Sequence, residues 1–431
     1  MPDAVKDALA LLPSTVCASL AFVLSFGVTG ELWFNLAAGV AGFALSMWFL
    51  VRHSRWRVAV TAIGTSCLLL GAIAPNVLDR LHQKPAPASD GLVRQIGSVS
   101  IPFANVDAGT GFADLDPLRK IWQGARIVAL GEATHGTSEF FRMKRRLTEF
   151  LVTQMGFRHF AMELDEDTAA GIEAYIQGRG NSNPVASLYW PWRTQEVAAM
   201  VDWMRKYNES AAAPDRVYFH GIDYQGERRD FQMARNTLRL LDEVGVDGRV
   251  ILWAHNAHVS SGAGWMGSYL KPALRNQIYL TGFEFHHGRF TSNLGWVRTY
   301  EAEPADTRFY AATLMRIGRP ILFLDFRTMM ESPAVEAWLA QPRLSHHLQE
   351  AHGFLRLNPA WVRDDESWPS LYDGVIYIEE SMPARLLYAP RRLWPPRSRA
   401  KTEEALRHYF KSIGAVDSVH PKVAVQGEDP F

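Results

Sequence analysis

The chain has 431 residues, with 45 acidic and 45 basic side chains, and it contains two cysteines, Cys17 and Cys67. The length predicts more than one structural unit, and the balanced charge excludes a strongly basic surface of the kind that binds nucleic acid. Both cysteines lie in apolar runs near the N-terminus, which excludes a disulfide framework, a cysteine zinc site and a catalytic thiol in the rest of the chain.

Three apolar runs open the sequence, at residues 9–28, 32–51 and 58–78. Each is about 20 residues long and free of internal charge, as expected of a helix that crosses a bilayer. A cleaved signal peptide would explain one such run but not three in succession. We therefore predict a transmembrane region of three helices within residues 1–80, in contact with the lipid bilayer through residues 9–78. Pro13 weakens the first run, for which an interfacial helix is the alternative.

The orientation follows from the loops between these runs. Residues 52–57, RHSRWR, contain three arginines, whereas the loop TGE between the first two runs has no basic residue. The positive-inside rule places the arginine loop in the cytoplasm. The third helix then ends on the far side, so the C-terminal domain is expected outside the cytoplasm, at a bacterial inner membrane. Residues 81–95 contain the Pro/Ala-rich stretch QKPAPASDG and are predicted as a linker, followed by a domain over residues 96–431.

Short apolar runs rich in β-branched and aromatic residues recur in this domain. They predict strands at residues 126–130, 159–164, 216–222, 249–255, 277–285, 320–326 and 374–380. Helical patterns lie between them: Ser138 is a predicted N-cap, and Met143, Leu147, Phe150 and Leu151 share one face of the helix that follows. This alternation predicts an α/β domain with a mostly parallel sheet covered by helices.

Polar residues follow the first four predicted strands, where ligands bind in sheets of this kind. In chain order they are Glu132 and His135, Glu163, Asp223, and then His255, Asn256 and His258. If these strands are neighbours, the carboxylates and imidazoles meet at one edge of the sheet. His255 and His258 share a site only if the strand stops between them, because residues three apart on a strand face opposite sides.

The motif GEATHG, residues 131–136, places an acid and an imidazole directly after the first strand. Its two glycines are expected to give the backbone freedom to turn. The chain has no G-x-S-x-G nucleophile elbow and no H-E-x-x-H zinc motif. A histidine can accept a proton from water near neutral pH, and a carboxylate can fix its tautomer. His135 could therefore activate water, oriented by Glu132 or Glu163.

Other interpretations use the same residues. A single acid or histidine at a strand end is usually a cap or an ion-pair partner. Mixed carboxylate and imidazole ligands also suit several divalent ions, and a metal-dependent hydrolase would use Glu132, His135, Glu163, His255 and His258. A third possibility is a non-catalytic cell-envelope protein, for binding or polysaccharide assembly, in which the cleft serves recognition.

Several blocks, taken together, resemble the erythromycin esterase family over residues 96–390. They are ARIVALGEATHG, AMELD, HGIDYQG, RDFQMARNTLRLL and ILWAHNAHV, in this order. The resemblance implies hydrolysis of a lactone, as in macrolide antibiotics, by histidine-activated water without a cofactor, a required metal or a covalent intermediate. It implies His135 as the base, accompanied by Glu132, Glu163, His255 and His258.

Two departures from the family bear on the substrate. Lys144 stands where the esterases have arginine, and lysine cannot make the planar two-pronged contact of a guanidinium. The macrolide esterases carry a long helical segment between the GIDYQG and RDFQMARN blocks, whereas here Glu227 and Arg228 alone separate them. A more open cleft is therefore expected, with Lys144, Asp223 and Asn256 binding a small-molecule ester or lactone that need not be a macrolide.

Overall fold

The computed structural model describes residues 85–293, 297–346, 362–363 and 366–387. The predicted transmembrane helices lie outside these residues. Within the described ranges, no helix has both the length and the apolar composition that crossing a bilayer requires. The described residues from Ala86 onward belong to one compact unit.

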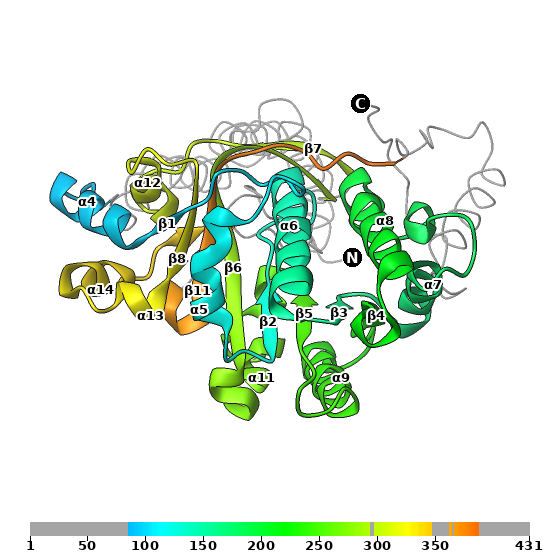
Figure 1. Cartoon of the computed structure of the whole chain (residues 1–431). Helices are drawn as coiled ribbons and strands as arrows, with labels where there is room; N and C mark the ends of the chain where they lie inside the picture. Colours follow the sequence, from blue (N-terminus) through cyan, green and yellow to red (C-terminus); the bar gives the residue numbers. More distant parts are fainter. Residues whose placement is uncertain (1–84, 294–296, 347–361, 364–365, 388–431) are drawn as a thin grey trace, which may run out of the picture. The chain divides into compact units, whose positions relative to one another are not determined.

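A nine-stranded sheet forms the centre of this unit, in the order β1–β8–β11–β6–β2–β5–β3–β4, with β7 paired to β6 (Figure 1). Its strands are β1 (Ile101–Pro102), β2 (Ile127–Leu130), β3 (His159–Met162), β4 (Tyr218–Gly221), β5 (Val250–Trp253), β6 (Ile278–Asn293), β7 (Val297–Ala302), β8 (Ile321–Asp325) and β11 (Gly374–Ser381); β9 (Leu344–Ser345) and β10 (Val362–Arg363) pair separately. Strands β11, β6, β2, β5, β3 and β4 are parallel to one another, whereas β1, β7 and β8 are antiparallel to their neighbours. The predicted mostly parallel sheet is confirmed, and every predicted run overlaps a strand.

Helices cover both faces of the sheet. They are α4 (Asp90–Val99), α5 (Asp116–Trp122), α6 (Ser138–Met155), α7 (Glu166–Ile176), α8 (Gln195–Ser210), α9 (Arg229–Glu243), α10 (Asn256–Val259), α11 (Met266–Leu274), α12 (Tyr310–Met315), α13 (Phe326–Met329), α14 (Pro333–Leu339) and α15 (Trp368–Leu371). Helices α5 to α8 pack on one face, and α4, α9 and α11 to α14 pack on the other. Strand β2 shows why its sequence is continuously apolar: Val128 and Leu130 face the first layer, and Ile127 and Ala129 face the second.

Helix α6 has the predicted apolar face but begins one residue earlier than predicted. Thr137 occupies the N-cap position, and Ser138 is the first helical residue. The Ser138 hydroxyl donates a hydrogen bond of 2.7 Å to the Glu196 carboxylate instead of capping its own helix. The N-cap prediction for Ser138 is therefore wrong, because a partner on α8 takes its side chain.

Helix α4 begins inside residues 81–95, the segment predicted as a linker. The Ser89 hydroxyl caps it by accepting a hydrogen bond from the backbone N–H of Leu92 at 3.2 Å. Val93 and Ile96 are buried, and Arg316 donates to the Asp90 carboxylate at 2.6 Å. From Asp90 onward the segment is thus helical and packed on the domain. The linker prediction is based on the Pro/Ala residues that precede this helix.

Strand β6 extends eight residues beyond its predicted end at Phe285, to Asn293. Apart from Gly288 and Phe290 this extension consists of polar residues, so it has no apolar run that sequence analysis could detect. Pairing with β7 and β11 forms it instead. Because β2 stops opposite Thr281, the extension stands beyond the carboxyl edge of the central strands. It contacts the GEATHG loop there, where the Thr291 N–H donates to the Gly136 carbonyl at 2.9 Å.

The two glycines of GEATHG are needed for close packing. A Cβ atom on Gly136 would lie 1.9 Å from the Thr291 carbonyl oxygen, and one on Gly131 would lie 2.3 Å from the Asn256 side-chain oxygen. Neither glycine is among the positive-φ residues of the described chain. Close approach to neighbouring atoms, rather than the predicted freedom to turn, is therefore the reason for glycine here. Ala384 also donates to the Gly136 carbonyl, at 2.8 Å.

Gly136→Ala is expected to lower the free energy of unfolding by about 1–3 kcal/mol, because the added methyl group must displace the β6 backbone. Gly171→Ala is the matched control. Gly171 lies in α7 and has no atom within 4 Å of an added Cβ, so this change should leave stability unchanged or raise it. Thermal unfolding of both full-length variants makes the comparison, and equal midpoints would contradict the close-packing interpretation.

Candidate active site

The carboxyl ends of four neighbouring parallel strands carry the candidate site. In the order β2–β5–β3–β4, these strands end at Leu130, Trp253, Met162 and Gly221. Glu132, Glu163 and His255 follow the first three ends within two residues. The structure therefore brings the residues predicted from separate strand ends to one edge of the sheet.

The Glu132 carboxylate is completely buried and accepts hydrogen bonds from three side chains. Its Oε1 atom lies 2.7 Å from His135 Nδ1. Its Oε2 atom accepts from Lys144 Nζ at 2.7 Å and from Trp253 Nε1 at 2.9 Å. A carboxylate can only accept, so His135 carries its proton on Nδ1. The Nε2 atom of His135 is then the nitrogen able to take up a proton.

Lys144 reaches the site from the second turn of α6. Its ammonium lies 4.2 Å from the ring centroid of Trp253 and 5.6 Å from that of Phe283. Complete burial lowers the pKa of Lys144 to about 8, against the opposing attraction of Glu132. Its ammonium therefore binds Glu132 and faces the rings of Trp253 and Phe283. A contact between Lys144 and the substrate stays a prediction.

His135 lies beside a second imidazole. Its ring centroid is 4.7 Å from that of His255 and 5.2 Å from that of Trp192, which is edge-on to it. Strand β5 ends at Trp253 and α10 begins at Asn256, so the chain turns between His255 and His258. Both histidines thus lie beyond the end of the strand, so the strand geometry that would put them on opposite faces does not apply, and a shared site stays a prediction.

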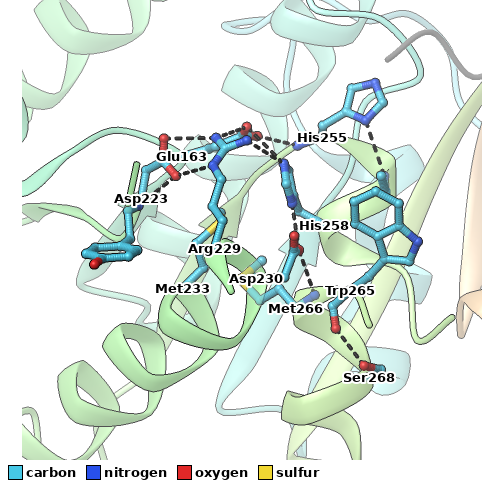
Figure 2. Close-up of polar contacts among 12 residues, drawn as sticks. Glu163, Asp223, Arg229, Asp230, Met233, His255, His258, Trp265, Met266 and Ser268 are labelled. Carbon is cyan, nitrogen blue, oxygen red and sulfur yellow. Dashed lines mark hydrogen bonds and ion pairs between the residues drawn. The ribbon is translucent and has the colours of Figure 1, made fainter. Parts of the chain in front are cut away.

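Glu163 and Asp223 meet at Arg229, the first residue of α9 (Figure 2). Arg229 donates to Glu163 Oε1 at 2.9 Å, and to the two oxygens of Asp223 at 2.7 and 2.9 Å. Burial alone raises the pKa of Glu163, but the charges of His258, His135 and Arg229 outweigh it and hold this pKa well below its usual range. Glu163 is therefore a carboxylate, and its Oε2 atom accepts from the His255 backbone N–H at 2.8 Å.

His258 lies between two carboxylates. Its Nε2 atom is 3.2 Å from Glu163 Oε1, and its Nδ1 atom is 2.7 Å from Asp230 Oδ1. Burial lowers the pKa of His258, but Glu163 and Asp230 together raise it to about 10. At neutral pH His258 is therefore a cation, with both ring N–H groups directed to acids.

Asn256 joins two elements of the scaffold. Its side chain donates to the Phe283 carbonyl at 2.8 Å and accepts from the Phe283 N–H at 3.0 Å. The Asn256 backbone N–H also donates to the Glu132 carbonyl, at 2.9 Å. These bonds tie α10 to β6 and to the GEATHG loop. Substrate binding by Asn256 and Asp223 stays a prediction.

Sequence analysis missed Arg229, Asp230, Trp192 and Trp253 as parts of the site. The first two begin α9, so the search for polar residues at strand ends passed over them. Their signal was present in the RDFQMARN block, which opens with an adjacent cation and anion. Trp253 is the last residue of β5, but its indole is apolar enough to be assigned to the core by pattern alone.

The metal-dependent interpretation requires its histidines and acids to surround one point. In the ranges that the structure describes, no group of three or more His, Cys, Asp or Glu side chains is arranged to hold a metal ion. The carboxylates of Glu132 and Glu163 bind Lys144 and Arg229 instead.

The fold and site together define an α/β protein with a buried histidine–carboxylate pair and an adjoining charged cluster at the carboxyl edge of its sheet. The model of one family, described as erythromycin esterase, matches residues 152–228 and 224–381, more than half of the chain. The chain belongs to the erythromycin esterase family, which confirms the resemblance found in its sequence. Glu163, Arg229 and His258 lie within the matched residues, whereas Glu132, His135 and Lys144 precede them.

Two curated proteins are similar over shorter stretches. The chain is 34% identical over 127 residues to erythromycin esterase type II of Escherichia coli, covering 28% of this chain and 29% of that protein. It is 33% identical over 122 residues to the putative hydrolase YbfO of Bacillus subtilis, covering 28% of this chain and 27% of that one. Each match spans less than a third of the relative's length.

A solved structure described as a succinoglycan biosynthesis protein has the same fold. The two superpose with a TM-score of 0.59 and 22% sequence identity, over 69% of this chain and 98% of the other. This likeness confirms the α/β architecture.

The buried Lys144 gives the stability of the protein a specific pH dependence. The unfolded chain keeps the Lys144 proton until pH 10.5, whereas the native state releases it near pH 8. Between these values the unfolded state binds more protons, so this residue makes stability rise with pH, by about 3 kcal/mol over the window. Arginine does not titrate there, so Lys144→Arg should lack this contribution.

Unfolding midpoints of the wild type and of Lys144→Arg, compared from pH 7 to pH 10.5, test this expectation. The two proteins differ at residue 144 alone, so the difference between the two curves reports on Lys144 and on the Glu132 carboxylate that it binds. A constant difference across the range would show that Lys144 does not titrate near pH 8.

Proposed function

We propose that this protein is a hydrolase that cleaves an ester or a lactone with water activated by His135. The observation that carries the proposal is the 2.7 Å contact between His135 Nδ1 and the buried Glu132 carboxylate. It gives the histidine one defined tautomer and a base at Nε2, which is the arrangement that general-base catalysis needs. Membership of the erythromycin esterase family supports the same reaction class.

In the proposed reaction one proton passes from water to His135, and one proton passes from an imidazolium to the leaving oxygen. His135 Nε2 takes a proton from water as the water oxygen attacks the carbonyl carbon, and the negative charge passes to the carbonyl oxygen. The new imidazolium is stabilised by Glu132, and it also lies in the field of Glu163. When the C–O bond breaks, the leaving oxygen takes a proton from an imidazolium, and the acid product remains. We assign His255, whose ring lies beside that of His135, to the carbonyl or leaving oxygen.

The substrate class is proposed more broadly than a macrolide. Residues 222–228 alone connect β4 to α9, and Tyr224 in this connection is 46% exposed. A short, exposed connection beside Asp223 and Arg229 supports an open cleft. Lys144 also supports a substrate class broader than a macrolide. Its ammonium binds Glu132, and it cannot make the planar two-pronged contact that the arginine of the macrolide esterases could make.

We further propose that residues 9–78 anchor the protein in a bacterial inner membrane through three helices, with the domain outside the cytoplasm. The support is the length and lack of charge of the three apolar runs and the arginines of residues 52–57. A hydrolase in this position would act on molecules of the cell envelope or its surroundings.

A non-catalytic role in polysaccharide assembly is the other candidate. The structurally similar protein is described as a succinoglycan biosynthesis protein, but at 22% identity this likeness concerns the fold. The buried Glu132–His135 pair favours the hydrolase, because burying a carboxylate is costly and recognition of a glycan does not require it.

His135→Asn should abolish hydrolysis across a panel of aryl esters and lactones, macrolides included, because asparagine cannot take a proton from water. His220→Asn is the matched control, since His220 lies on β4 and contacts His159 rather than Glu132. Turnover is measured with the purified full-length chain before and after chelation. Activity retained by His135→Asn would reject the role of His135, and activity lost on chelation would favour the metal-dependent alternative.

The topology makes a separate prediction. In intact spheroplasts an added protease should degrade the domain, because it faces outward, and alkaline carbonate should leave the chain in the membrane fraction. A C-terminal tag serves as the probe, and a known cytoplasmic protein is the control for spheroplast lysis. Protection of the tag, or its release by carbonate, would contradict the proposed anchoring and orientation.

A further inference from the structure

Asp230 is a residue of the site that neither the strand-end pattern nor the proposed reaction uses. It lies in the first turn of α9, and its carboxylate is largely buried, with 14% of the side chain exposed. Its Oδ1 atom lies 2.7 Å from His258 Nδ1 and accepts from the backbone N–H of Met266 at 2.9 Å. Figure 2 shows the carboxylate between His258 and the start of α11.

We propose that Asp230 is a positioning residue of the hydrolytic site: together with Glu163 it encloses His258, so that His258 remains a doubly protonated, fixed cation instead of a catalytic acid or base. This inference rests on the proposed function for its effect on turnover. It also revises the role that the sequence predicted for His258, and it leaves His135 and His255 as the imidazoles that exchange protons with substrate.

The geometry supports a fixed cation because each ring nitrogen of His258 faces a carboxylate oxygen. Nδ1 faces Asp230 at 2.7 Å, and Nε2 faces Glu163 at 3.2 Å. Neither carboxylate can donate a proton, so each of these two contacts is favourable when the ring nitrogen that faces the carboxylate carries a proton. The imidazolium then has no lone pair with which to act as a base, and releasing either proton would leave a buried carboxylate without its partner.

Asp230 is itself held in place by its surroundings. It lies at the N-terminal end of α9, and it also accepts from the first residue of α11, so the backbone N–H groups of two helices favour its negative charge. The N-terminal ends of helices stabilise carboxylates in this way even when they are partly buried. Asp230 therefore presents a hydrogen-bonded carboxylate oxygen to the ring of His258.

The charge of His258 acts on the proposed catalytic residues through Glu163. Among the charges acting on Glu163, that of His258 contributes most to lowering its pKa. The other oxygen of Glu163 accepts the His255 backbone N–H at 2.8 Å. Asp230 thus fixes His258, His258 stabilises the Glu163 carboxylate, and Glu163 holds the turn that carries His255.

The groups that face His258 come from three parts of the chain. Glu163 follows β3, and Arg229 and Asp230 are the first two residues of α9. Trp265 precedes α11, and its ring centroid lies 5.7 Å from that of His258 in an edge-on arrangement. Arg229 Nη1 lies 3.3 Å from His258 Nε2, whereas the Nε and Nη2 atoms of Arg229 pair with Asp223 and Glu163. Two cations, Arg229 and His258, therefore oppose three carboxylates, so loss of the His258 charge would increase the negative charge that the cluster already carries in excess.

Asp230→Asn separates charge from structure. The asparagine oxygen can still accept from His258 and from Met266, so the contact between α9, α10 and α11 is retained while the charge is lost. Asp202→Asn is the matched control, because Asp202 on α8 accepts hydrogen bonds from Tyr175 and Asn183, away from the site. Asp230→Ala removes both the charge and the hydrogen bond.

The first measurement is kinetic, with p-nitrophenyl acetate and the full-length chain from roughly pH 5 to pH 10. In Asp230→Asn, His258 should lose its proton at lower pH, so kcat should acquire a new decline on the alkaline side, reaching about 10- to 100-fold. KM should change less, and Asp202→Asn should follow the wild type. A wild-type pH profile for Asp230→Asn, with kcat within about twofold, would overturn the proposal.

The second measurement needs no substrate. Nitrogen NMR of ring-labelled histidine in the full-length chain, assigned with His258→Gln, should show both His258 nitrogens protonated at neutral and mildly alkaline pH, and a neutral ring in Asp230→Asn at the alkaline end. A neutral or readily titrating His258 in the wild type would reject the fixed cation. The expected NMR result without turnover in the wild type would instead reject the proposed hydrolysis and leave the fixed cation supported.

Discussion

The buried Glu132 carboxylate is the contact on which the candidate site depends. Removing a carboxylate from water is costly unless opposite charge and hydrogen bonds compensate it. Here Lys144 from α6, Trp253 from β5 and His135 from its own loop supply that compensation. The same three bonds therefore connect a strand end, a helix and the proposed base, so the position of His135 follows from the requirement to satisfy a buried charge.

Glu163 plays the corresponding part in the neighbouring cluster. It holds the backbone of His255 on one oxygen, and it meets Arg229 and His258 on the other. Glu132 thus contacts His135, and Glu163 contacts His258. Glu132 contacts one ring nitrogen of His135, whereas Glu163 and Asp230 together face both ring nitrogens of His258. This difference in surroundings gives identical side chains different chemical capacities, as in other sites where paired titratable groups are separated by environment.

Segments distant in the sequence keep the GEATHG loop in place. Thr291 of β6 and Ala384 beyond β11 both donate to the Gly136 carbonyl, and Asn256 packs against Gly131. The family model matches Asn256 and Thr291, whereas Ala384 and the loop itself lie outside the matched residues. Membership of the erythromycin esterase family therefore rests on the scaffold around the loop that carries the proposed base.

The sequence by itself determined the alternating strands and helices, the mostly parallel sheet and the strand-end location of Glu132, Glu163 and His255. Local apolar periodicity carries that information, because a strand buried on both faces must be apolar at every position. Tertiary structure alone decided that Lys144 reaches Glu132, that Ser138 bonds to α8 instead of capping α6, and that β6 continues through polar residues to Asn293. It also added Arg229 and Asp230 to the site. Each of these depends on a partner far away in the chain, and no local pattern records which distant side chain will satisfy a buried charge or an unpaired strand.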